Sequence, residues 1–378
     1  MKRVAIVHDW LVNYGGAERV VEELLKIYPE ADIFTLVYDE KKMGKIFPRD
    51  RVHTSFLQKL PFSTKLYTKL LSFMPKAFES FDLSNYKLVI CSSSSCAKGV
   101  ITPPLVPHVA YIHTPMRYAW DKYFEYKSRS GKITQFFMEK WMSKIRLWDY
   151  VSSQRVDTLI ANSNYISRRI KKYWNRESQV IYPPVNVKDL QPNGKEPEDF
   201  FVVFSRFVPY KRIDLAIQAC GNLKKNLVVI GSGSQKKQLK KLASRYKDVK
   251  ITFTGRIRDD EVRDYLQRCR ALIFCAEEDF GIIPVEAQCC GRPVIAFGKG
   301  GALETIINGK TGTFFSHATP DSVERAIKRF EELEKQGAFD SAFISNHAKE
   351  FSRERFAREI KEAIDNTIIK LDEETTKK

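Results

Sequence analysis

The stretch ALIFCAEEDFGIIPVEAQCCGRPVIAF, residues 271–297, carries the pattern that determines the fold class. It opens with an apolar run at 271–275 and closes with another at 293–297, and each run predicts a buried strand. Between them, Pro284 marks the start of a helix and Gly291 marks its end. A strand, a helix and a second strand in this order are typical of a βαβ unit, so the stretch predicts a parallel sheet.

The same alternation of strand and helix patterns runs through both halves of the 378-residue chain. The remaining strand candidates are 3–7, 31–37, 88–91, 108–112, 158–161, 200–204, 226–230 and 249–253. A polar run with Pro and Gly at 188–199 is typical of a linker. We therefore predict an α/β protein with two Rossmann-like domains, at 1–188 and 189–351, and a helix at 352–372 that completes the first.

The composition is that of an ordinary globular protein. Hydrophobic residues make up 43% of the chain, and no apolar stretch approaches the roughly 20 residues that a transmembrane helix needs. The first apolar run turns polar at His8 and Asp9, which indicates a strand rather than an export signal. The seven cysteines contain no Cys-x-x-Cys pair, as expected for free thiols in a reducing cytoplasm. We therefore predict a cytoplasmic protein.

The formal net charge of +17 predicts an anionic partner. Between Lys41 and Phe78, nine basic residues accompany a single acid, Asp50, and alternate with Leu, Phe and Met. This composition favours a segment that lies on an anionic membrane surface, although a solvated segment packed on its own domain is an open alternative. A basic nucleic-acid-binding protein is the alternative of another class. Because the sequence carries no nucleic-acid-binding motif, we expect no nucleic-acid partner.

Two acidic residues follow the strand at 271–275. Glu278 lies in the loop after this strand, and Glu286 lies in the first turn of the predicted helix. Alone, Glu286 could be an acid favoured by the helix dipole. Ligands of parallel α/β sheets bind at the carboxyl ends of strands, so the pair instead predicts two carboxylates that hold two ends of one ligand. Phe280 and Gly281 between them would let the backbone approach that ligand.

Basic and small residues follow the neighbouring strands. Arg206 and Lys211 come after 201–204 and predict a clamp for a diphosphate, although a solvated basic loop has the same pattern. The Gly-Ser-Gly turn at 231–233 resembles a phosphate-binding turn but lacks the full Gly-x-Gly-x-x-Gly motif.

In the first half, Gly15 and Gly16 lie at a strand-to-helix turn. His113 directly follows the strand at 108–112, with Arg117 close by. A lone histidine is more often structural, but a position at the end of a strand favours a functional role. The sequence therefore places candidate groups after strands of both domains.

These elements together resemble the retaining glycosyltransferases of family 4, which have the two-domain GT-B fold. The resemblance covers almost the full chain and rests on GGAE at 15–18, His113, ANSNYISRRI at 161–170, VIYPPVNV at 180–187, Arg206 with Lys211, the turn at 231–233, TGR at 254–256, and Glu278-x7-Glu286 within 276–301. The stretch YIHTPMRYAWDKY at 111–123 looks most like bacterial and archaeal mannosyltransferases that build O-antigen and other surface polysaccharides.

The resemblance implies a role for each candidate and places the site in a central cleft that the two parallel sheets face. Arg206 and Lys211 would hold the donor diphosphate, and these cations would replace a metal because no Asp-x-Asp element appears. Glu286 would bind the ribose hydroxyls, and Glu278 and His113 would contact the transferred sugar. The implied catalytic residues are thus Glu278, His113, Arg206 and Lys211, with no cofactor and no assigned nucleophile.

The remaining implied contacts form two sets. The donor-binding set is Gly15, Gly16, Arg206, Lys211, Gly231, Ser232, Gly233, Arg256, Ile257, Phe280, Gly281, Ile282, Ile283 and Glu286. The acceptor-binding set is Asp9, Trp10, Arg117, Tyr118 and Trp120.

By this resemblance the protein is a hexosyltransferase, with mannose from GDP-mannose as the favoured donor. The acceptor would be a saccharide linked to a polyprenyl diphosphate, used in polysaccharide biosynthesis by a peripheral enzyme on the inner face of the cell membrane. Its first domain would bind the acceptor and its second the nucleotide-sugar. A UDP-sugar or another nucleotide-sugar donor is the main alternative. Sugar-nucleotide 2-epimerases share the two-domain fold but resemble the Glu278-to-Glu286 element less.

Overall fold

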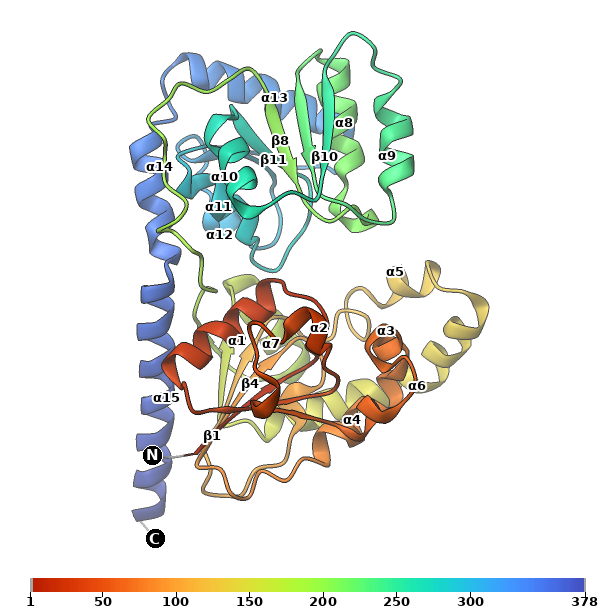
Figure 1. Cartoon of the computed structure of the whole chain (residues 1–378), viewed down its shortest axis with the longest axis vertical. Helices are drawn as coiled ribbons and strands as arrows, with labels where there is room; N and C mark the ends of the chain where they lie inside the picture. The colour runs from red at the N-terminus through yellow and green to blue at the C-terminus, as the bar shows by residue number, and fades with distance from the viewer. Residues whose placement is uncertain (1–2, 377–378) are drawn as a thin grey trace. The chain divides into compact units, whose positions relative to one another are not determined.

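The computed structural model describes residues 3–376, which form two compact units (Figure 1). The first unit holds the chain up to Pro184 together with the residues from Phe356 onward, and the second holds Val185–Arg355. The chain therefore passes between units at 184–185, rather than at 188–189 as the composition of the linker predicts. Helix α15 (Arg353–Thr376), dark blue in Figure 1, lies almost wholly in the first unit.

The first unit contains a seven-stranded parallel sheet in the order β3-β2-β1-β4-β5-β6-β7 within the described part of the chain. Its strands are β1 (Val4–His8), β2 (Asp32–Thr35), β3 (Val52–Thr54), β4 (Leu88–Ser93), β5 (His108–Ile112), β6 (Thr158–Ala161) and β7 (Gln179–Val180). The sequence predicts five of these. It misses β3 and β7, which are short, lie at the two edges and expose at least one side chain to solvent.

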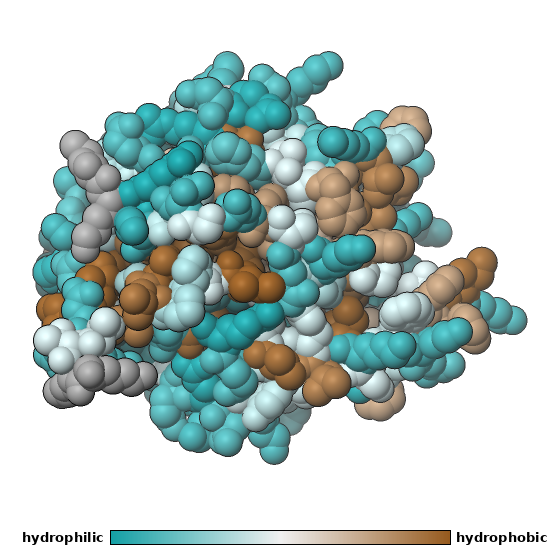
Figure 2. All heavy atoms as spheres, turned by 90° about the horizontal axis from the view of Figure 1, so that it is seen from below, coloured by the Kyte–Doolittle hydropathy of each residue, from teal (hydrophilic) through white to brown (hydrophobic). Residues whose placement is uncertain are grey.

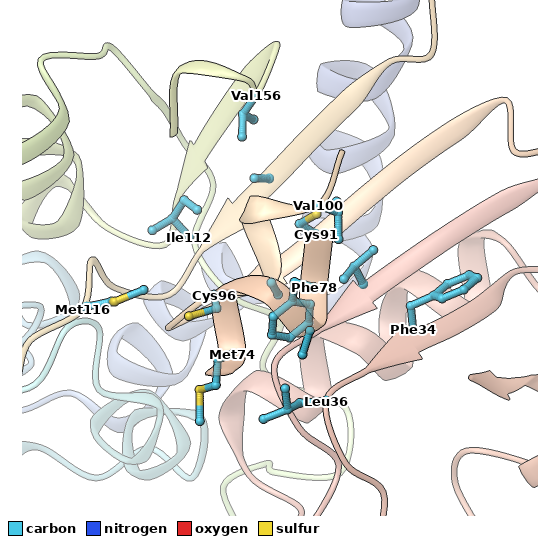
Figure 3. Close-up of a cluster of buried hydrophobic side chains, with 14 of the residues drawn as sticks. Phe34, Leu36, Met74, Phe78, Cys91, Cys96, Val100, Ile112, Met116 and Val156 are labelled. Carbon is cyan, nitrogen blue, oxygen red and sulfur yellow. The ribbon is translucent and has the colours of Figure 1, made fainter. Parts of the chain in front are cut away.

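Two hydrophobic cores lie on the opposite faces of this sheet, because successive side chains of a strand alternate in direction. One core joins Ile6 and Tyr111 to α1 (Gly16–Ile27) and to α15. The other core joins Cys91 and Ile112 to α4 (Met74–Glu79), α6 (Lys132–Gln154) and α7 (Asn164–Trp174). Figure 3 shows part of the second core, in which Phe34 from β2, Phe78 from α4 and Ile112 from β5 gather on one side of the strands.

The segment Lys41–Phe78 is not one continuous helix. It contains short helices, η1 (Arg49–Arg51), η2 (Phe56–Lys59), α3 (Ser63–Leu66) and η3 (Tyr67–Phe73), and strand β3. It begins within α2 (Glu40–Met43) and ends within α4. Phe47 and Leu57 are buried in the protein, whereas Phe62 and Phe73 are exposed. Only part of the apolar content of this segment is therefore available to a surface.

The second unit contains a six-stranded parallel sheet in the order β10-β9-β8-β11-β12-β13 within residues 3–376. Its strands are β8 (Phe201–Phe204), β9 (Leu227–Ile230), β10 (Ile251–Gly255), β11 (Ala271–Phe274), β12 (Val294–Phe297) and β13 (Gly312–Phe315). Its helices are η5 (Pro209–Lys211), α8 (Ile213–Asn222), α9 (Lys236–Ala243), α10 (Asp259–Arg268), α11 (Ile282–Cys289), α12 (Ala302–Thr305), α13 (Pro320–Lys335), α14 (Ser341–Ala348) and η6 (Lys349–Phe351).

The start of one helix differs from the sequence-based expectation. Helix α11 begins at Ile282, with Gly281 as its N-cap at φ 89°, so Glu286 lies in the second turn and not in the first. The all-apolar start of α11 hides its first turn from a reading of the periodicity. The seven cysteines are free and buried, as predicted.

A buried ion pair fixes α6 to the loop that follows β4. Lys98 is fully buried in η4 (Ala97–Gly99), and its Nζ lies 2.6 Å from Oδ1 of Asp149 on α6. The other carboxylate oxygen accepts hydrogen bonds from the indole nitrogens of Trp120 at 2.7 Å and Trp174 at 2.8 Å. Because all of these groups are paired, the cost of burying two charges is offset. If only one partner were removed, a charge would be left buried without compensation.

We therefore expect Lys98→Met to lower the free energy of unfolding by about 3–5 kcal/mol, although methionine is apolar and of similar size. The matched control is Lys171→Met, which breaks the ion pair between Lys171 and Glu177, whose side chains are 54% and 82% exposed. That change should cost about 1 kcal/mol or less, because exposed pairs contribute little. Urea unfolding of the two variants measures the difference, and equal losses would contradict the role assigned to Lys98.

Candidate functional site

In the second unit, the strand order places two loops on either side of a reversal. From β8 the chain adds β9 and β10 on one side, and then returns to add β11, β12 and β13 on the other. The loops after β8 and β11 therefore leave the sheet in different directions. Ligands of open parallel sheets bind in the crevice between two such loops. Lys211 follows β8, and Glu278 follows β11. The predicted clamp and the first predicted carboxylate thus lie at this position.

Lys211 and Glu278 contact each other directly. Lys211 Nζ forms an ion pair with Glu278 Oε1, and the two side chains are 8% and 24% exposed. The Lys211 ammonium also lies 5.2 Å from the ring centroid of Tyr210, whose hydroxyl accepts a hydrogen bond from Arg206 at 3.0 Å. The sequence predicts both residues but not the pairing. The structure therefore links the predicted diphosphate clamp to a predicted sugar-binding carboxylate.

The backbone of Glu278 is held by the two consecutive glycines Gly300 and Gly301. Gly301 donates its N–H to the Glu278 carbonyl oxygen at 2.9 Å. Gly300 has φ 66°, and a Cβ there would lie 2.2 Å from the same oxygen. Only glycine fits this position, because both the conformation and the space exclude a side chain. Glu278 consequently enters the site from a rigid loop.

The loops after β8, β9 and β10 pack side by side. A Cβ at Gly231 would lie 1.9 Å from the Ser205 carbonyl oxygen, so glycine allows this approach. Phe207 N–H donates to the Ser232 carbonyl at 2.9 Å, and Gly231 N–H donates to that of Gly255 at 2.9 Å. Arg256, next to Gly255, is exposed, and Ile257 packs partly into the core. Gly231, Ser232 and Gly233 therefore lie beside the loop that contains Arg206.

Helix α11 supplies the second predicted carboxylate. Phe280 is buried and lies 5.7 Å from the ring of Phe351, which fixes the loop before the helix. Ile282 and Ile283 form the first turn and are half-buried. Glu286 is 8% exposed, on the turn that follows. A carboxylate with so little access to water needs polar partners, and the hydroxyl groups of a ligand could be added to them.

In the first unit, the strand order reverses between β1 and β4. Asp9, directly after β1, accepts hydrogen bonds from four consecutive backbone N–H groups, those of residues 94–97. Ser94 Oγ donates to the same carboxylate at 3.0 Å. With both oxygens occupied, Asp9 holds the loop after β4, so we expect it to shape the predicted acceptor site and not to contact the acceptor itself.

The other predicted acceptor residues also have partners within this unit. Tyr118 Oη lies 2.7 Å from Ser95 Oγ, and Trp120 bonds to Asp149 and stacks on Tyr173 with ring centroids 4.8 Å apart. Trp10 packs against Tyr67 at 4.9 Å. Arg117 is half-buried.

Three polar residues that the sequence does not single out connect to His113. Glu18 Oε1 lies 3.5 Å from Nε2 of His8, and His8 Nδ1 lies 3.1 Å from the Ser92 carbonyl oxygen and 3.2 Å from Ser92 Oγ. Ser92 Oγ lies 2.8 Å from Nε2 of His113. His8, Ser92 and His113 continue the alternating apolar rows of β1, β4 and β5 by one step. All three residues thus occupy the same position in the alternation of their strands, and this is the sequence signal that could have identified them.

The pKa values of His8 and His113 are shifted in opposite directions. Burial lowers the pKa of His8, but a hydrogen bond and the charge of Glu18, the charge of Asp9 and the Ser92 carbonyl outweigh it, so the pKa is raised above 6.5. Burial, followed by the charge of His8, lowers the pKa of His113 to about 3. His113 is therefore neutral near pH 7.

Two further features concern metals and membranes. Within residues 3–376, no group of three or more His, Cys, Asp or Glu side chains is placed to hold a metal ion. In the same range, no helix is both long enough and apolar enough to span a bilayer.

Comparison with known sequence families places the chain. The family description "Glycosyltransferase Family 4" matches residues 14–189, and "Glycosyl transferases group 1" matches residues 186–350. Together the two matches cover both units. The chain belongs to the family 4 and group 1 glycosyltransferases, which have the GT-B fold. The predicted family and the predicted α/β fold of two parallel-sheet domains are thereby confirmed.

Several relatives of this glycosyltransferase have names that state an activity. An uncharacterised glycosyltransferase of Methanocaldococcus jannaschii is 30% identical over 52% of this chain and 55% of its own length. The alpha-1,3/1,6-mannosyltransferase of Saccharomyces cerevisiae is 24% identical over 98% of this chain and 86% of its own. The O-antigen chain mannosyltransferase C of Escherichia coli is 23% identical over 91% and 90%.

Solved structures share the fold of this glycosyltransferase. The Anabaena protein HepE, in complex with UDP, aligns with a TM-score of 0.72 at 18% identity and covers 96% of this chain and 100% of its own. Its complex with UDP-glucose aligns with a TM-score of 0.70.

The pairing of Lys211 with Glu278 predicts a coupled response to mutation. Lys211→Met and Glu278→Gln should each destabilise the protein, since each leaves the other group poorly paired at a partly buried site. The double variant should lose less than the sum of the two, by about 1–3 kcal/mol. Urea unfolding of the four proteins measures this coupling. Additive losses would show that the two side chains do not interact in solution.

Proposed function

We propose that this glycosyltransferase is a retaining hexosyltransferase that transfers mannose from GDP-mannose to a lipid-linked saccharide. The observation that carries the proposal is the Lys211–Glu278 pair at the reversal of strand order in the second unit, beside the loop from Arg206. One cation and one carboxylate in contact suit a ligand in which a diphosphate is joined directly to a sugar. The mannosyltransferase names of the yeast and E. coli relatives support the choice of sugar.

The second unit would bind the donor. Arg206 and Lys211 would hold the diphosphate and offset the charge that develops on it as the glycosidic bond breaks. Glu286 would accept hydrogen bonds from the ribose hydroxyls, and Glu278 would accept them from the sugar. Because Lys211 is already held by Glu278, the clamp needs little rearrangement when the donor binds.

Several backbone groups complete the proposed donor site. The N–H groups at the start of α11, in Ile282 and Ile283, suit phosphate or sugar oxygens. Arg256 and Ile257 would lie near the base. The glycines at 231 and 233 and at 15 and 16 would let the backbone pass close to the diphosphate. His113 of the first unit would contact the same sugar.

We propose that the reaction needs no metal and no cofactor, because two basic side chains are available for two phosphate groups. Turnover after dialysis against a chelator would test this. A UDP-sugar donor is the second candidate, and the observation in its favour is that the Anabaena structures contain UDP and UDP-glucose.

The acceptor is proposed to be a polyprenyl-diphosphate-linked saccharide bound by the first unit, with Trp10 and Arg117 as contacts. Helix α6 supports a membrane-bound acceptor, because it exposes Phe136, Phe137 and Trp141 next to Lys140 and Lys144. Exposed apolar side chains among lysines are typical of a surface that lies on an anionic leaflet. On the right side of Figure 2, where α5 (Tyr123–Ser128) and α6 extend in Figure 1, hydrophobic side chains are exposed beside hydrophilic ones.

The segment Lys41–Phe78 adds to this surface through exposed Phe62 and Phe73 and through exposed Lys59, Lys65, Lys69 and Lys76. The enzyme would then be cytoplasmic and peripheral on the inner face of the membrane. Each lysine near an anionic surface contributes about 1 kcal/mol.

Donor identity can be tested by thermal unfolding with GDP, UDP, ADP and their sugar conjugates, without added metal. A ligand at 100 times its dissociation constant stabilises the protein by roughly 2.7 kcal/mol, so a shift confined to GDP and GDP-mannose is expected. Glu286→Ala should abolish the shift, whereas Glu278→Ala should reduce turnover more than binding.

The outcomes of this experiment are distinct. A shift confined to UDP and its sugar conjugates would mean that the donor carries a sugar other than mannose. The fold and the proposed site would then stand unchanged. If no nucleotide has an effect while RNA binds with a strong salt dependence, the protein is a nucleic-acid binder and the proposal fails.

Membrane attachment can be tested by sedimentation with two kinds of vesicle, one of neutral lipid alone and one with about 30% anionic lipid added. The double variant Lys140→Glu/Lys144→Glu should bind anionic vesicles at least about tenfold more weakly. The control, Lys236→Glu/Lys237→Glu on exposed α9, makes the same charge change in the other unit and should bind normally. Equal losses in both variants would indicate an effect of net charge alone.

A further inference from the structure

The chain of contacts from Glu18 to His113 has no role in the reaction proposed above. It crosses three adjacent elements, α1, β1 and β4, and reaches the end of β5. His8 and Ser92 are 2% and 0% exposed, and Glu18 is 7% exposed. Buried polar groups are retained at a cost unless they are paired, so a chain of four needs an explanation beyond packing.

The positions of the hydrogen atoms follow from the partners. His8 Nδ1 lies 3.1 Å from the Ser92 carbonyl oxygen, which can only accept a hydrogen bond. Nδ1 of His8 must therefore carry a proton. Its other nitrogen, Nε2, faces the Glu18 carboxylate at 3.5 Å, which favours a proton there as well. His8 is consequently favoured as an imidazolium.

Ser92 passes this constraint to the next histidine. Its hydroxyl oxygen accepts from His8 Nδ1, so its single proton must be donated elsewhere. Among the contacts of residues 3–376, the acceptor that this hydroxyl meets is His113 Nε2, at 2.8 Å. A nitrogen that accepts a hydrogen bond carries no proton, so His113 must have its proton on Nδ1. In the described part of the chain, Nδ1 of His113 has no hydrogen-bond partner.

We propose that Glu18, His8 and Ser92 are positioning residues that hold His113 as the Nδ1–H tautomer. The Nδ1–H group is then a preformed donor for a hydroxyl oxygen of the transferred sugar, a step that rests on the proposed function. A donor whose tautomer is fixed before the substrate binds costs no rearrangement during the reaction.

The electrostatics of the cluster agree with this assignment. The groups that face His8 are Glu18 on α1, Asp9 in the loop after β1, Ser92 on β4 and His113 directly after β5, and the two acids favour its charged form. The charge of His8 in turn helps to keep His113 neutral. Gly15 contributes space, because a Cβ there would lie 3.3 Å from Glu18 Oε2.

The tautomer can be read directly by NMR of the imidazole nitrogens in protein labelled with ¹⁵N-histidine, without any substrate. The chain has six histidines, so assignment by single substitution is practical. In the wild-type protein, Nδ1 of His113 should carry the proton. In Ser92→Ala, the Nε2–H form should appear, and Ser92→Thr, which keeps the hydroxyl, should retain the Nδ1–H form. Glu18→Gln should lower the pKa of His8.

Ser93→Ala is the matched control. Ser93 is the next residue of β4 and is also buried, but its hydroxyl bonds to the Lys98 backbone N–H at 3.3 Å. Its removal should leave the His113 tautomer unchanged. If wild-type His113 carries its proton on Nε2, or if Ser92→Ala does not alter the tautomer, the proposal is wrong.

A kinetic experiment separates this proposal from the proposed function. With the donor found by thermal unfolding, Ser92→Ala should reduce kcat about tenfold or more and leave the nucleotide dissociation constant unchanged. An altered tautomer with a normal kcat would overturn the positioning role. If no sugar nucleotide is a substrate of the wild-type protein, the function fails, whereas the NMR result would still establish or refute the tautomer.

Discussion

The reversal of strand order in each parallel sheet is the constraint on which the rest of the structure depends. At this position two loops leave the carboxyl edge toward opposite faces, and side chains from both can meet without covering the edge. Each unit places contacts between buried or partly buried polar side chains there. In the second unit the contact is between Lys211 and Glu278, and in the first unit it involves Asp9, His8 and Ser92. Burial of these groups is tolerated because every one of them has a partner.

The sequence predicts the sheets well because their central strands are almost wholly apolar. Strands β5 and β6 have the predicted bounds, and most others agree within two residues or so. The strands that were missed are of a different kind. β3 (VHT) and β7 (QV) are short and partly polar, and β13 (GTFF) begins with glycine. They form the sheet edges, where pairing with a single neighbour sets the backbone and local composition gives little indication.

The site could be predicted only as far as chain position allows. That Glu278, Lys211 and His113 follow strands can be read from apolar runs, and a resemblance to a family assigns them roles. Contacts between distant residues cannot be read this way, because they depend on which strands are neighbours and in what register. The partners of Asp9 lie 85 or more positions away, and Ser92 meets His8 across 84. The start of α11 depends on the positive φ angle of its N-cap, Gly281, and hydrophobic periodicity gives no information about this angle.

The sheet of the first unit contains its own comparison for the argument about His8. His108, at the start of β5, is as deeply buried as His8, but its ring lies against Cys91, with Nε2 3.1 Å from Sγ. Burial lowers its pKa to about 3, whereas the pKa of His8 is raised. Because the two burials are alike, the neighbouring charges account for the difference: the acids near His8, of which Glu18 has the larger effect, raise its pKa, and the cations Arg155 and Lys98 lower the pKa of His108. In the proposed arrangement, Glu18 in the first turn of α1 determines the charge of His8 and, through Ser92, the position of the proton on His113. The GGAE stretch then has two roles, since its glycines also allow the backbone to approach the ligand closely.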